Sequence, residues 1–334
     1  MASKNQASPK RNTIYDIAKA TGVSAGTVSR ALNGKGNVSQ ETRDKILKVA
    51  QELNIKPSSS SGTKIVALFN EPTFTDRVIG YSATLSTHLS YALASEGIAV
   101  IEPQNPFEEL SSLFIDGLIA VTYNKESEAR LAELEKTTPT VYLDKFEIQE
   151  GQHTVGSDHH QAGYIAAQHL IEAGKQKPGF YSPDVTAFRK RLAGFTQAIN
   201  ERGLSITPDL YSLRSENDNA YSAIAKLIRN DCDGIYVPGS SLQAIEAMHV
   251  LQYVMGMKIP EDISIIGGEN EGLSRILSPP LTTVKEPLLE MATAAVEMIC
   301  KRIRRVEVDE KRMILPVSIT ERSSVSHSEK IHAQ

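Results

Sequence analysis

The chain has 334 residues, 40% of them apolar and 23% charged, which suits two or three globular domains with cores of their own. It holds no apolar run of the ~18 residues that span a bilayer, and its polar start, MASKNQASPKRN, lacks the apolar segment of a secretory signal, so we expect a cytoplasmic protein without a membrane segment. The net charge of −4 hides an asymmetry, because residues 1–57 carry ten basic and four acidic side chains and the remainder carries 26 and 36.

Residues 13–57 are predicted to form three short helices around tight turns. Thr13 is the expected N-cap of the first helix, Gly22 ends that helix, and Ser24 caps the second helix. Ser39 is expected to cap the third helix in the same way. This is helix–turn–helix geometry, in which the second helix enters the major groove of DNA.

The outward face of the second helix carries Thr27, Ser29 and Arg30, which are two short polar side chains and one long guanidinium. Basic residues that can pair with phosphates surround it, namely Lys19, Lys35, Arg43, Lys45 and Lys48. Together with the basic charge of the whole head, these residues favour DNA binding. The alternative is a three-helix bundle with no role in DNA binding.

The segment TIYDIAKATGVSAGTVSRALNG, followed by VSQETRDKILKVAQELNIKP, resembles the head of the LacI/GalR-type (lactose-repressor) transcription factors over about 45 ungapped residues. By position, the resemblance places Ala25 and Gly26 where the family has its main base-reading side chains, and makes Arg30 the third reader. It also implies residues that hold phosphates or shape the turn, which are Thr13, Tyr15, Ser24, Thr27, Ser29, Asn33, Ser39 and Thr42. Because Ala25 and Gly26 offer almost no side chain, Arg30 is expected to carry much of the direct readout.

The body, residues 64–323, alternates short β-branched runs with helical stretches, a pattern typical of parallel sheets covered by helices on both faces. The predicted strands are 64–69, 98–103, 117–122, 140–144, 177–182, 234–239 and 264–268. The predicted helices are 81–97, 161–174, 188–203, 219–231 and 241–256. The fold class expected is therefore an all-α helix–turn–helix head plus an α/β body of two doubly wound, parallel-sheet subdomains.

The body resembles the periplasmic-binding-protein-like core of the same family, through RLAGFTQAI, CDGIYV, KIPEDISIIGGEN, SPPLTTV and LPVSITERSS in family order. The resemblance implies a small-molecule effector, a sugar or related metabolite, in the cleft between the subdomains. By position Arg191 matches the arginine that clamps the effector, and Asp158, Ser240, Ser241 and Glu269 fall at pocket positions. The alternative for Arg191 is a structural ion pair with an acidic neighbour.

The expected domain boundaries follow from these patterns. They are a tail at 1–12, the head at 13–57, a Ser/Gly linker at 58–63, the core at 64–323 and a C-terminal tail at 324–334. Within the core, 64–155 with 285–310 is expected to form one subdomain, and 156–284 with 311–323 the other.

The linker departs from the family pattern. The resemblance implies a hinge helix with an Asn and a minor-groove leucine after the Pro57 position, but the chain has SSSSGTK there. Serine and glycine form helices poorly and no apolar wedge is present, so we expect a flexible tether. Without a hinge helix, control of DNA binding is expected to act through the spacing of the heads.

No P-loop, GxGxxG, GxSxG or HExxH motif occurs in the chain, so we expect no catalysis and no cofactor. His159 and His160 are adjacent on a helix and cannot jointly grip one metal, and Cys232 and Cys300 are expected to be buried small hydrophobes. The partners expected are a double-stranded DNA operator, the effector and a second copy of the chain, since one head reads one half-site. Two alternatives stay open: an effector-independent dimeric regulator with a degenerate pocket, and a cytoplasmic small-molecule binding protein with a vestigial head.

Overall fold

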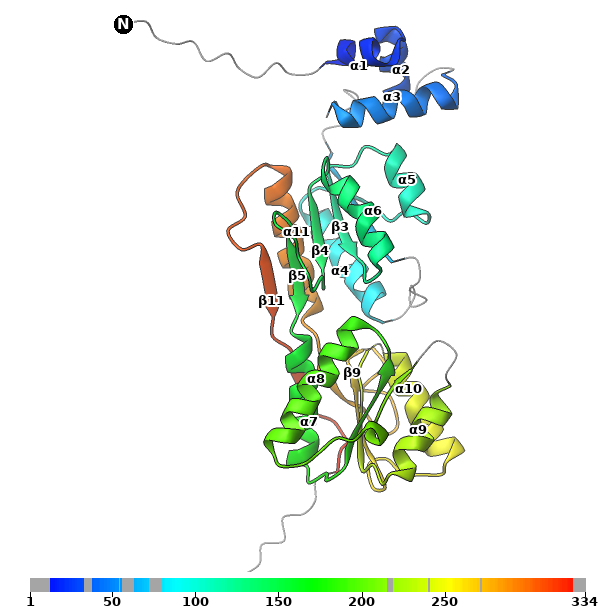
Figure 1. The fold of residues 1–334 in the computed structure, drawn as a ribbon, viewed down its shortest axis with the longest axis vertical. Coiled ribbons are helices and arrows are strands. Elements are labelled where there is room, and N and C mark those ends of the chain that lie inside the picture. The colour runs from blue at the N-terminus through cyan, green and yellow to red at the C-terminus, as the bar shows by residue number, and fades with distance from the viewer. Residues whose placement is uncertain are drawn as a thin grey trace, which may run out of the picture.

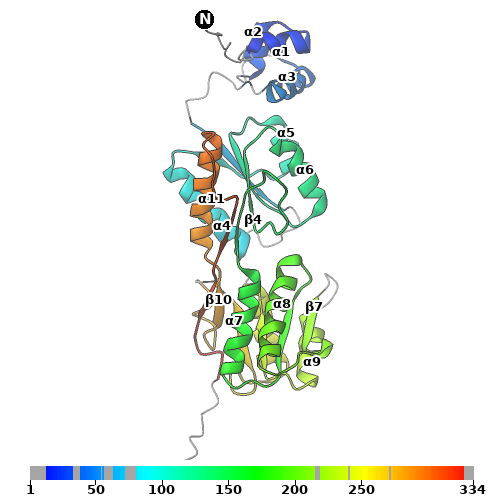
Figure 2. The same cartoon turned by 60° about the vertical axis from the view of Figure 1, so that its left-hand side comes forward.

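The computed structural model describes residues 13–32, 38–53, 55, 63–71, 80–214, 219–239, 241–270 and 272–326. These residues form a helical head followed by two α/β subdomains, arranged one after another along the long axis of the molecule (Figure 1). The head lies at the end of the first subdomain that faces away from the second (Figure 2). Among the described residues, no helix has the length and apolar character needed to cross a membrane.

The head has the three predicted helices, α1 (Ile14–Thr21), α2 (Ala25–Leu32) and α3 (Gln40–Glu52). The predicted caps are confirmed. The Thr13 amide donates to Asp16 Oδ2 at 2.7 Å, and the Thr27 amide donates to Ser24 Oγ at 3.1 Å. Gly22 ends α1 with a φ of 75°, a left-handed conformation that glycine adopts without steric cost.

The core of the head is built from the apolar stripes of these three helices. Ile17, Val28 and Ile46 have no exposed surface, and Ala50 on α3 is equally buried. Val23, between α1 and α2, packs against the same cluster. The local sequence pattern therefore accounts for the head.

The first subdomain contains a six-stranded sheet in the order β11-β5-β4-β3-β1-β2, in which every neighbouring pair is parallel. Its strands are β1 (Ile65–Asn70), β2 (Ala99–Ile101), β3 (Gly117–Val121), β4 (Thr140–Leu143), β5 (Thr154–Ser157) and β11 (Arg312–Leu315). One face packs against α4 (Tyr81–Ser95) and α11 (Leu288–Ile303), and the other against α5 (Pro106–Ser112) and α6 (Lys125–Glu135).

The second subdomain contains a six-stranded sheet in the order β12-β10-β9-β8-β6-β7. Its strands are β6 (Pro178–Pro183), β7 (Tyr211–Arg214), β8 (Gly234–Val237), β9 (Ser264–Gly268), β10 (Thr282–Lys285) and β12 (Ser318–Thr320). All neighbours are parallel except β12, which pairs with β10 antiparallel at the edge of the sheet. The parallel prediction therefore holds for all but this edge strand.

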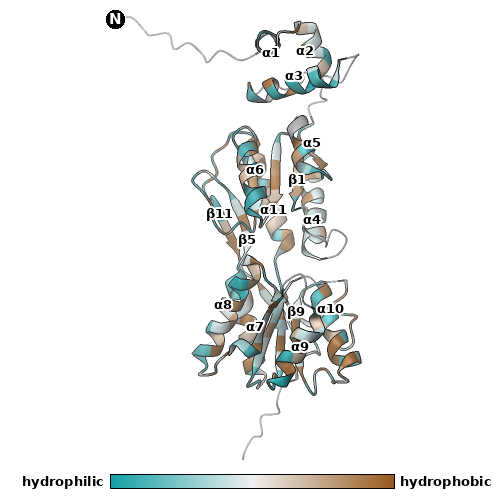
Figure 3. Cartoon of the chain, turned by 45° about the vertical axis from the view of Figure 1, so that its right-hand side comes forward, coloured by the Kyte–Doolittle hydropathy of each residue, from teal (hydrophilic) through white to brown (hydrophobic). Residues whose placement is uncertain are grey.

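Helices cover both faces of the second sheet as well. One face packs against α7 (His159–Glu172) and α8 (Thr186–Glu201), and the other against α9 (Ala220–Arg229), α10 (Ser241–His249) and the π-helix η2 (Val250–Val254). A single-turn 3₁₀ helix, η1 (Pro208–Leu210), leads into β7. In Figure 3 apolar residues concentrate on the strands, which lie between these helix layers.

The structure corrects two of the expected boundaries. β11 pairs with β5 in the first sheet, so 311–323 does not belong wholly to the second subdomain. The chain returns to the second sheet only at β12. The tail expected from 324 is also wrong at its start, because Ser324 is fully buried and its Oγ accepts from the Thr282 amide at 2.8 Å. This hydrogen bond attaches the segment to the second sheet.

Some expectations lie outside the described residues. They are the tail at 1–12, Asn33, all of the linker except residue 63, Ser240, and the C-terminal tail beyond residue 326. Cys232 and Cys300 are described, and both are buried as predicted.

Candidate functional site

The outer face of α2 presents the predicted base-reading residues. Gly26 and Arg30 are exposed, and Ala25 is half-buried at the start of the helix. The Arg30 guanidinium lies along the helix, with Nε donating to the Gly26 carbonyl at 3.2 Å and Nη2 donating to Thr27 Oγ1 at 3.3 Å. Ser24 Oγ lies 2.9 Å from the same Thr27 hydroxyl, so Ser24, Thr27 and Arg30 form one linked polar surface.

The other predicted DNA-contacting residues lie at helix starts or on the surface. Tyr15 is 71% exposed at the beginning of α1. Ser39 Oγ donates to Thr42 Oγ1 at 2.8 Å and accepts from the Thr42 amide at 3.4 Å at the beginning of α3. Helix N-termini with short hydroxyl side chains are suited to phosphate contacts. The start of each of the three helices of the head therefore carries hydroxyl side chains.

Arg191 lies at the junction of the two subdomains, where it has two partners. It projects from α8, is 2% exposed, and places Nη2 2.8 Å from Glu286 Oε1. Its Nε donates to His159 Nδ1 on α7 at 3.0 Å. Glu286, just after β10, also accepts from Ser157 Oγ of the first sheet at 2.8 Å. The pairing of Arg191 with an acidic neighbour, which the sequence left open, is what the structure shows.

His159 extends this network to the first subdomain. Since its Nδ1 accepts from Arg191, the ring proton is on Nε2, which lies 3.2 Å from Asp144 Oδ1. The Tyr81 hydroxyl of α4 donates to the other oxygen of Asp144. We call the six side chains of this set the junction network: Tyr81, Asp144, Ser157, His159, Arg191 and Glu286. It joins both subdomains through buried polar contacts.

The charges of the junction network are held by its geometry. Burial opposes ionisation of Asp144, but His159, the Tyr81 hydroxyl and the Ser157 amide keep the pKa of its carboxyl below the ordinary value. Its charge thus contributes stability that is present above the ordinary pKa and lost as pH falls through the lower folded-state value. Burial alone would lower the pKa of Arg191, yet Glu286 raises it, so the guanidinium stays charged.

Two glycines let α7 and α8 approach closely enough to place Arg191 beside His159. A Cβ on Gly163 of α7 would lie 1.7 Å from the Arg191 carbonyl oxygen, and a Cβ on Gly194 of α8 would lie 1.9 Å from the His160 carbonyl oxygen. Only glycine allows backbones to approach this closely. The contact between α7 and α8 therefore depends on both glycines, and it sets the distance between His159 and Arg191.

Aromatic rings border the junction network. Phe146, which follows β4, stacks on Tyr123 at a centroid distance of 6.3 Å and meets the His159 ring edge-on at 5.2 Å. On the other side, Cζ of Arg191 lies 5.3 Å from the centre of the Phe188 ring. A few charged groups among aromatic side chains are typical of a small-molecule site.

The network also contains a group of metal-type ligands that the sequence did not reveal. Ligand atoms of Asp144, His159 and Glu286 lie within 4.8 Å of one another. The Arg191 guanidinium contacts two of these three side chains directly. Arg191 thus supplies at this place the positive charge that a metal ion would bring.

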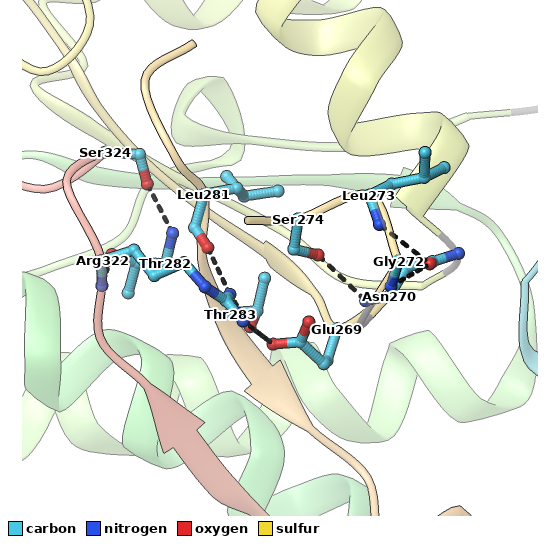
Figure 4. A network of polar contacts seen from close by, with 10 residues as sticks. All are labelled: Glu269, Asn270, Gly272, Leu273, Ser274, Leu281, Thr282, Thr283, Arg322 and Ser324. Carbon is cyan, nitrogen blue, oxygen red and sulfur yellow. Dashed lines mark hydrogen bonds and ion pairs between the residues drawn. The ribbon is translucent and has the colours of Figure 1, made fainter. Parts of the chain in front are cut away.

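Asp158 and Glu269, which were predicted to lie at effector-pocket positions, have partners within the protein. Asp158 is the N-cap of α7, where its Oδ1 accepts from the Gln161 amide at 2.8 Å. Glu269 Oε2 accepts from Arg322 Nη2 at 2.9 Å and from the Thr283 hydroxyl (Figure 4). These contacts fasten α7 and the edge of the second sheet. Ser241 opens α10, and its side chain lies outside the described set.

The sequence did not reveal the two carboxylates of the junction network, Asp144 and Glu286. Asp144 was placed at the end of a predicted strand, and in parallel sheets the carboxyl ends of strands are where ligands bind. Its position at the end of this strand would have been enough to identify Asp144 as a candidate site residue. Glu286 follows β10, which was not predicted as a strand, so the same signal was absent for it.

Comparison with known proteins agrees with both parts of the structure. Residues 13–58 match the model of the bacterial regulatory proteins of the lacI family, and residues 167–325 match that of a periplasmic binding protein-like domain. The chain is 30% identical to catabolite control protein A of Priestia megaterium, over 93% of this chain and 98% of that protein. It is 26% identical to the ribose operon repressor of Haemophilus influenzae, over 94% and 98%.

Solved structures share the fold along the same length. The transcriptional regulator CelR in complex with cellobiose superimposes with a TM-score of 0.69 at 23% identity, covering 94% of this chain and all of that one. The lac repressor dimer bound to operator and the anti-inducer ONPF superimposes with a TM-score of 0.66 at 20% identity, covering 95% and 100%. Head and body therefore occur together in these proteins in the order seen here.

Proposed function

Because the chain belongs to the LacI family of bacterial regulatory proteins, we propose that it is a cytoplasmic transcriptional repressor that binds an operator through α2 and is controlled by a small molecule bound between its subdomains. The observation that carries the proposal is the exposed face of α2, where Ser24, Thr27 and Arg30 form one polar surface on a rigid three-helix core. Arg30 is the residue of this face able to read a guanine by two hydrogen bonds.

We propose that the protein binds DNA as a homodimer, because one head contacts only one half-site of the operator. The second subdomain offers an apolar patch for this contact, in which Tyr253 is 80% and Ile276 is 68% exposed. Gln252 donates to the Ser278 carbonyl at 2.9 Å, so η2 and the 276–278 loop lie side by side. This patch supports pairing of two copies through their bodies.

Gel-shift titration against fragments of the source genome tests the DNA-binding role. We expect selected fragments to shift, and their affinity to fall by about 10³–10⁵ between ~50 and ~200 mM salt if six to ten phosphates are contacted. A single half-site is expected to bind far more weakly than the full site, because it engages one head of the dimer. An affinity that does not depend on salt, or equal binding of half-site and full site, would count against the proposal.

The effector we propose is a sugar or related polyhydroxylated metabolite, bound by Arg191 with Asp144 and Glu286. A guanidinium and two carboxylates can orient hydroxyl groups, and the rings of Tyr123, Phe146 and Phe188 flank them. Such a ligand would replace one of the contacts that Arg191 makes within the protein. The names of the relatives support this class, since one is a ribose operon repressor and another is a regulator in complex with cellobiose.

A thermal-shift screen of sugars, sugar phosphates and nucleosides tests the effector. At a concentration ~100 times its Kd, a true effector should stabilise the core by about 2.7 kcal/mol and raise Tm by roughly 5–10 °C. Arg191→Lys should lose this shift because lysine lacks the planar fork, whereas Arg322→Lys, on the Glu269 pair, should keep it. A Tm unmoved by every compound would favour the effector-independent regulator.

A further inference from the structure

The head and the first subdomain share one apolar side chain. Phe114 lies between α5 and β3 of the first subdomain, yet its ring packs against the apolar cluster of the head. Helix α3 of the head contacts α5 at the same place. The position of the head above α5 is visible in Figure 1. A residue of the core thus completes the packing of the head.

The head side of this contact is formed by the end of α3 and the residue beyond it. The Ile55 amide donates to the Ala50 carbonyl at 2.8 Å, which folds the chain back at the end of the helix. Ile55 is 9% exposed and Ala50 is fully buried. Both residues line the same pocket as Leu113 and Phe114, and Phe114 packs against the apolar cluster of the head. Apolar side chains therefore meet at this contact.

The contact borders an open pocket at the surface. Ala50 and Ile55 of the head and Leu110, Leu113 and Phe114 of the core line this pocket of about 370 Å³, together with further residues of the core. Among its described lining residues only these two come from the head, so the head meets the core along one side of the pocket.

Charge does not hold the head in place. Four basic and two acidic side chains line the same pocket, namely Lys64, Lys136, Arg302 and Arg305 with Asp116 and Glu135, and residues 1–57 carry ten basic and four acidic side chains. Like charges on the two sides oppose docking, so the apolar contact has to outweigh them. Added salt should therefore strengthen docking, whereas it weakens DNA binding.

Docking leaves the reading helix available. Gly26 and Arg30 on α2 are exposed in the docked arrangement, and the contact uses the end of α3 instead. The contact therefore orients the head and does not mask its polar face. Orienting a head before it meets its partner lowers the entropy that binding has to overcome.

We propose that Phe114 is a docking residue that holds the head on the first subdomain, so that the core sets the orientation of the head by direct contact. Because the Ser/Gly-rich stretch between residues 56 and 63 offers poor helix formers, a direct contact is a second route by which the core can act on the head. The inference does not depend on the proposed DNA-binding role, since it concerns the free protein.

Hydrogen–deuterium exchange of the full chain without DNA tests the proposal. Phe114→Ser should accelerate exchange in the α3 amides of residues 46–53 about fivefold to tenfold, as expected when a partly buried ring is removed. Tyr221→Ser, which removes a 51% exposed ring from α9 of the second subdomain, is the matched control and should leave α3 unchanged. Equal exchange in α3 for Phe114→Ser and wild type would overturn the proposal.

If Phe114→Ser unfolds the core, exchange in β3 and β4 will also become faster. In that case a distance measurement between the head and the core tests the proposal without this variant. Spin labels on Lys48→Cys and Lys136→Cys report on the two sides of the contact, and the native Cys232 and Cys300 are buried. Labelled chains diluted into unlabelled chains should give one narrow distance distribution, which stays narrow as salt is raised. A broad distribution in the wild-type background would contradict docking.

Discussion

Replacing Arg191 with alanine should lower the free energy of unfolding of the core by about 3–5 kcal/mol at neutral pH, the cost of leaving buried partners of a charge uncompensated. Arg191 is 2% exposed, and its guanidinium is the positive charge that faces Glu286 at 2.8 Å. Asp144 would keep its contacts with His159, Tyr81 and Ser157 and would lose only its longer-range attraction to the guanidinium. Urea denaturation followed by circular dichroism measures the loss.

The control for this prediction is Arg189→Ala, two residues earlier on α8. Arg189 makes an ion pair with Asp184 at 2.6 Å, but its side chain is 64% exposed, so solvent screens the pair and little stability should be lost. Adding Glu286→Gln to Arg191→Ala should recover part of the loss, because it removes a carboxylate that has lost its partner. If Arg191→Ala and Arg189→Ala lose equally little free energy of unfolding, the buried partners of Arg191 do not depend on its charge.

Replacing Gly163 with alanine should destabilise the core by more than about 4 kcal/mol or prevent its folding, since overpacking of two backbones cannot be relieved by a rotamer change. The added Cβ would lie 1.7 Å from the Arg191 carbonyl oxygen and 2.8 Å from the Phe195 amide nitrogen. Helices α7 and α8 would have to separate, which would also pull Arg191 away from His159. Urea denaturation or recovery of folded protein reports the effect.

Gly26→Ala is the matched control because Gly26 is also a helical glycine. Its added Cβ would meet only Ser24 Oγ, at 3.8 Å, so helix propensity should dominate and the head should gain about 0.5–1 kcal/mol. If the free energy of unfolding of Gly163→Ala lies within ~1 kcal/mol of the wild-type value, the close approach of α7 and α8 does not exist in solution.

The head was predictable in detail because its signals are local. Thr13, Gly22 and Ser24 each make a hydrogen bond to a residue three or four positions away, and all three lie at the predicted helix ends. The alternation of strands and helices also identified two doubly wound subdomains, because each strand–helix unit is a contiguous segment. In these parts a short window of sequence contains the interaction that decides the structure.

The assignment of the last strands depends on distant pairings. Only two residues separate the end of β11 from the start of β12, yet the two strands lie in different sheets. β11 pairs with residues near 155, and β12 pairs with residues near 284. The partner of Arg191 is likewise hidden, because Glu286 lies 95 residues away and no local pattern joins them. Resemblance supplied the position of Arg191, but not the carboxylate that it contacts.

The central claim is that this chain recognises specific DNA through α2. The most direct measurement is to incubate the full chain with fragments of its source genome, recover the bound fragments, sequence them, and repeat the selection with Arg30→Ala. The account predicts that the wild type enriches a small set of fragments sharing one near-palindromic site, and that Arg30→Ala lowers the ratio of specific to non-specific affinity by about 5–150-fold, the worth of one base contact. Enrichment of no shared site by the wild type, or an unchanged ratio for Arg30→Ala, would contradict it.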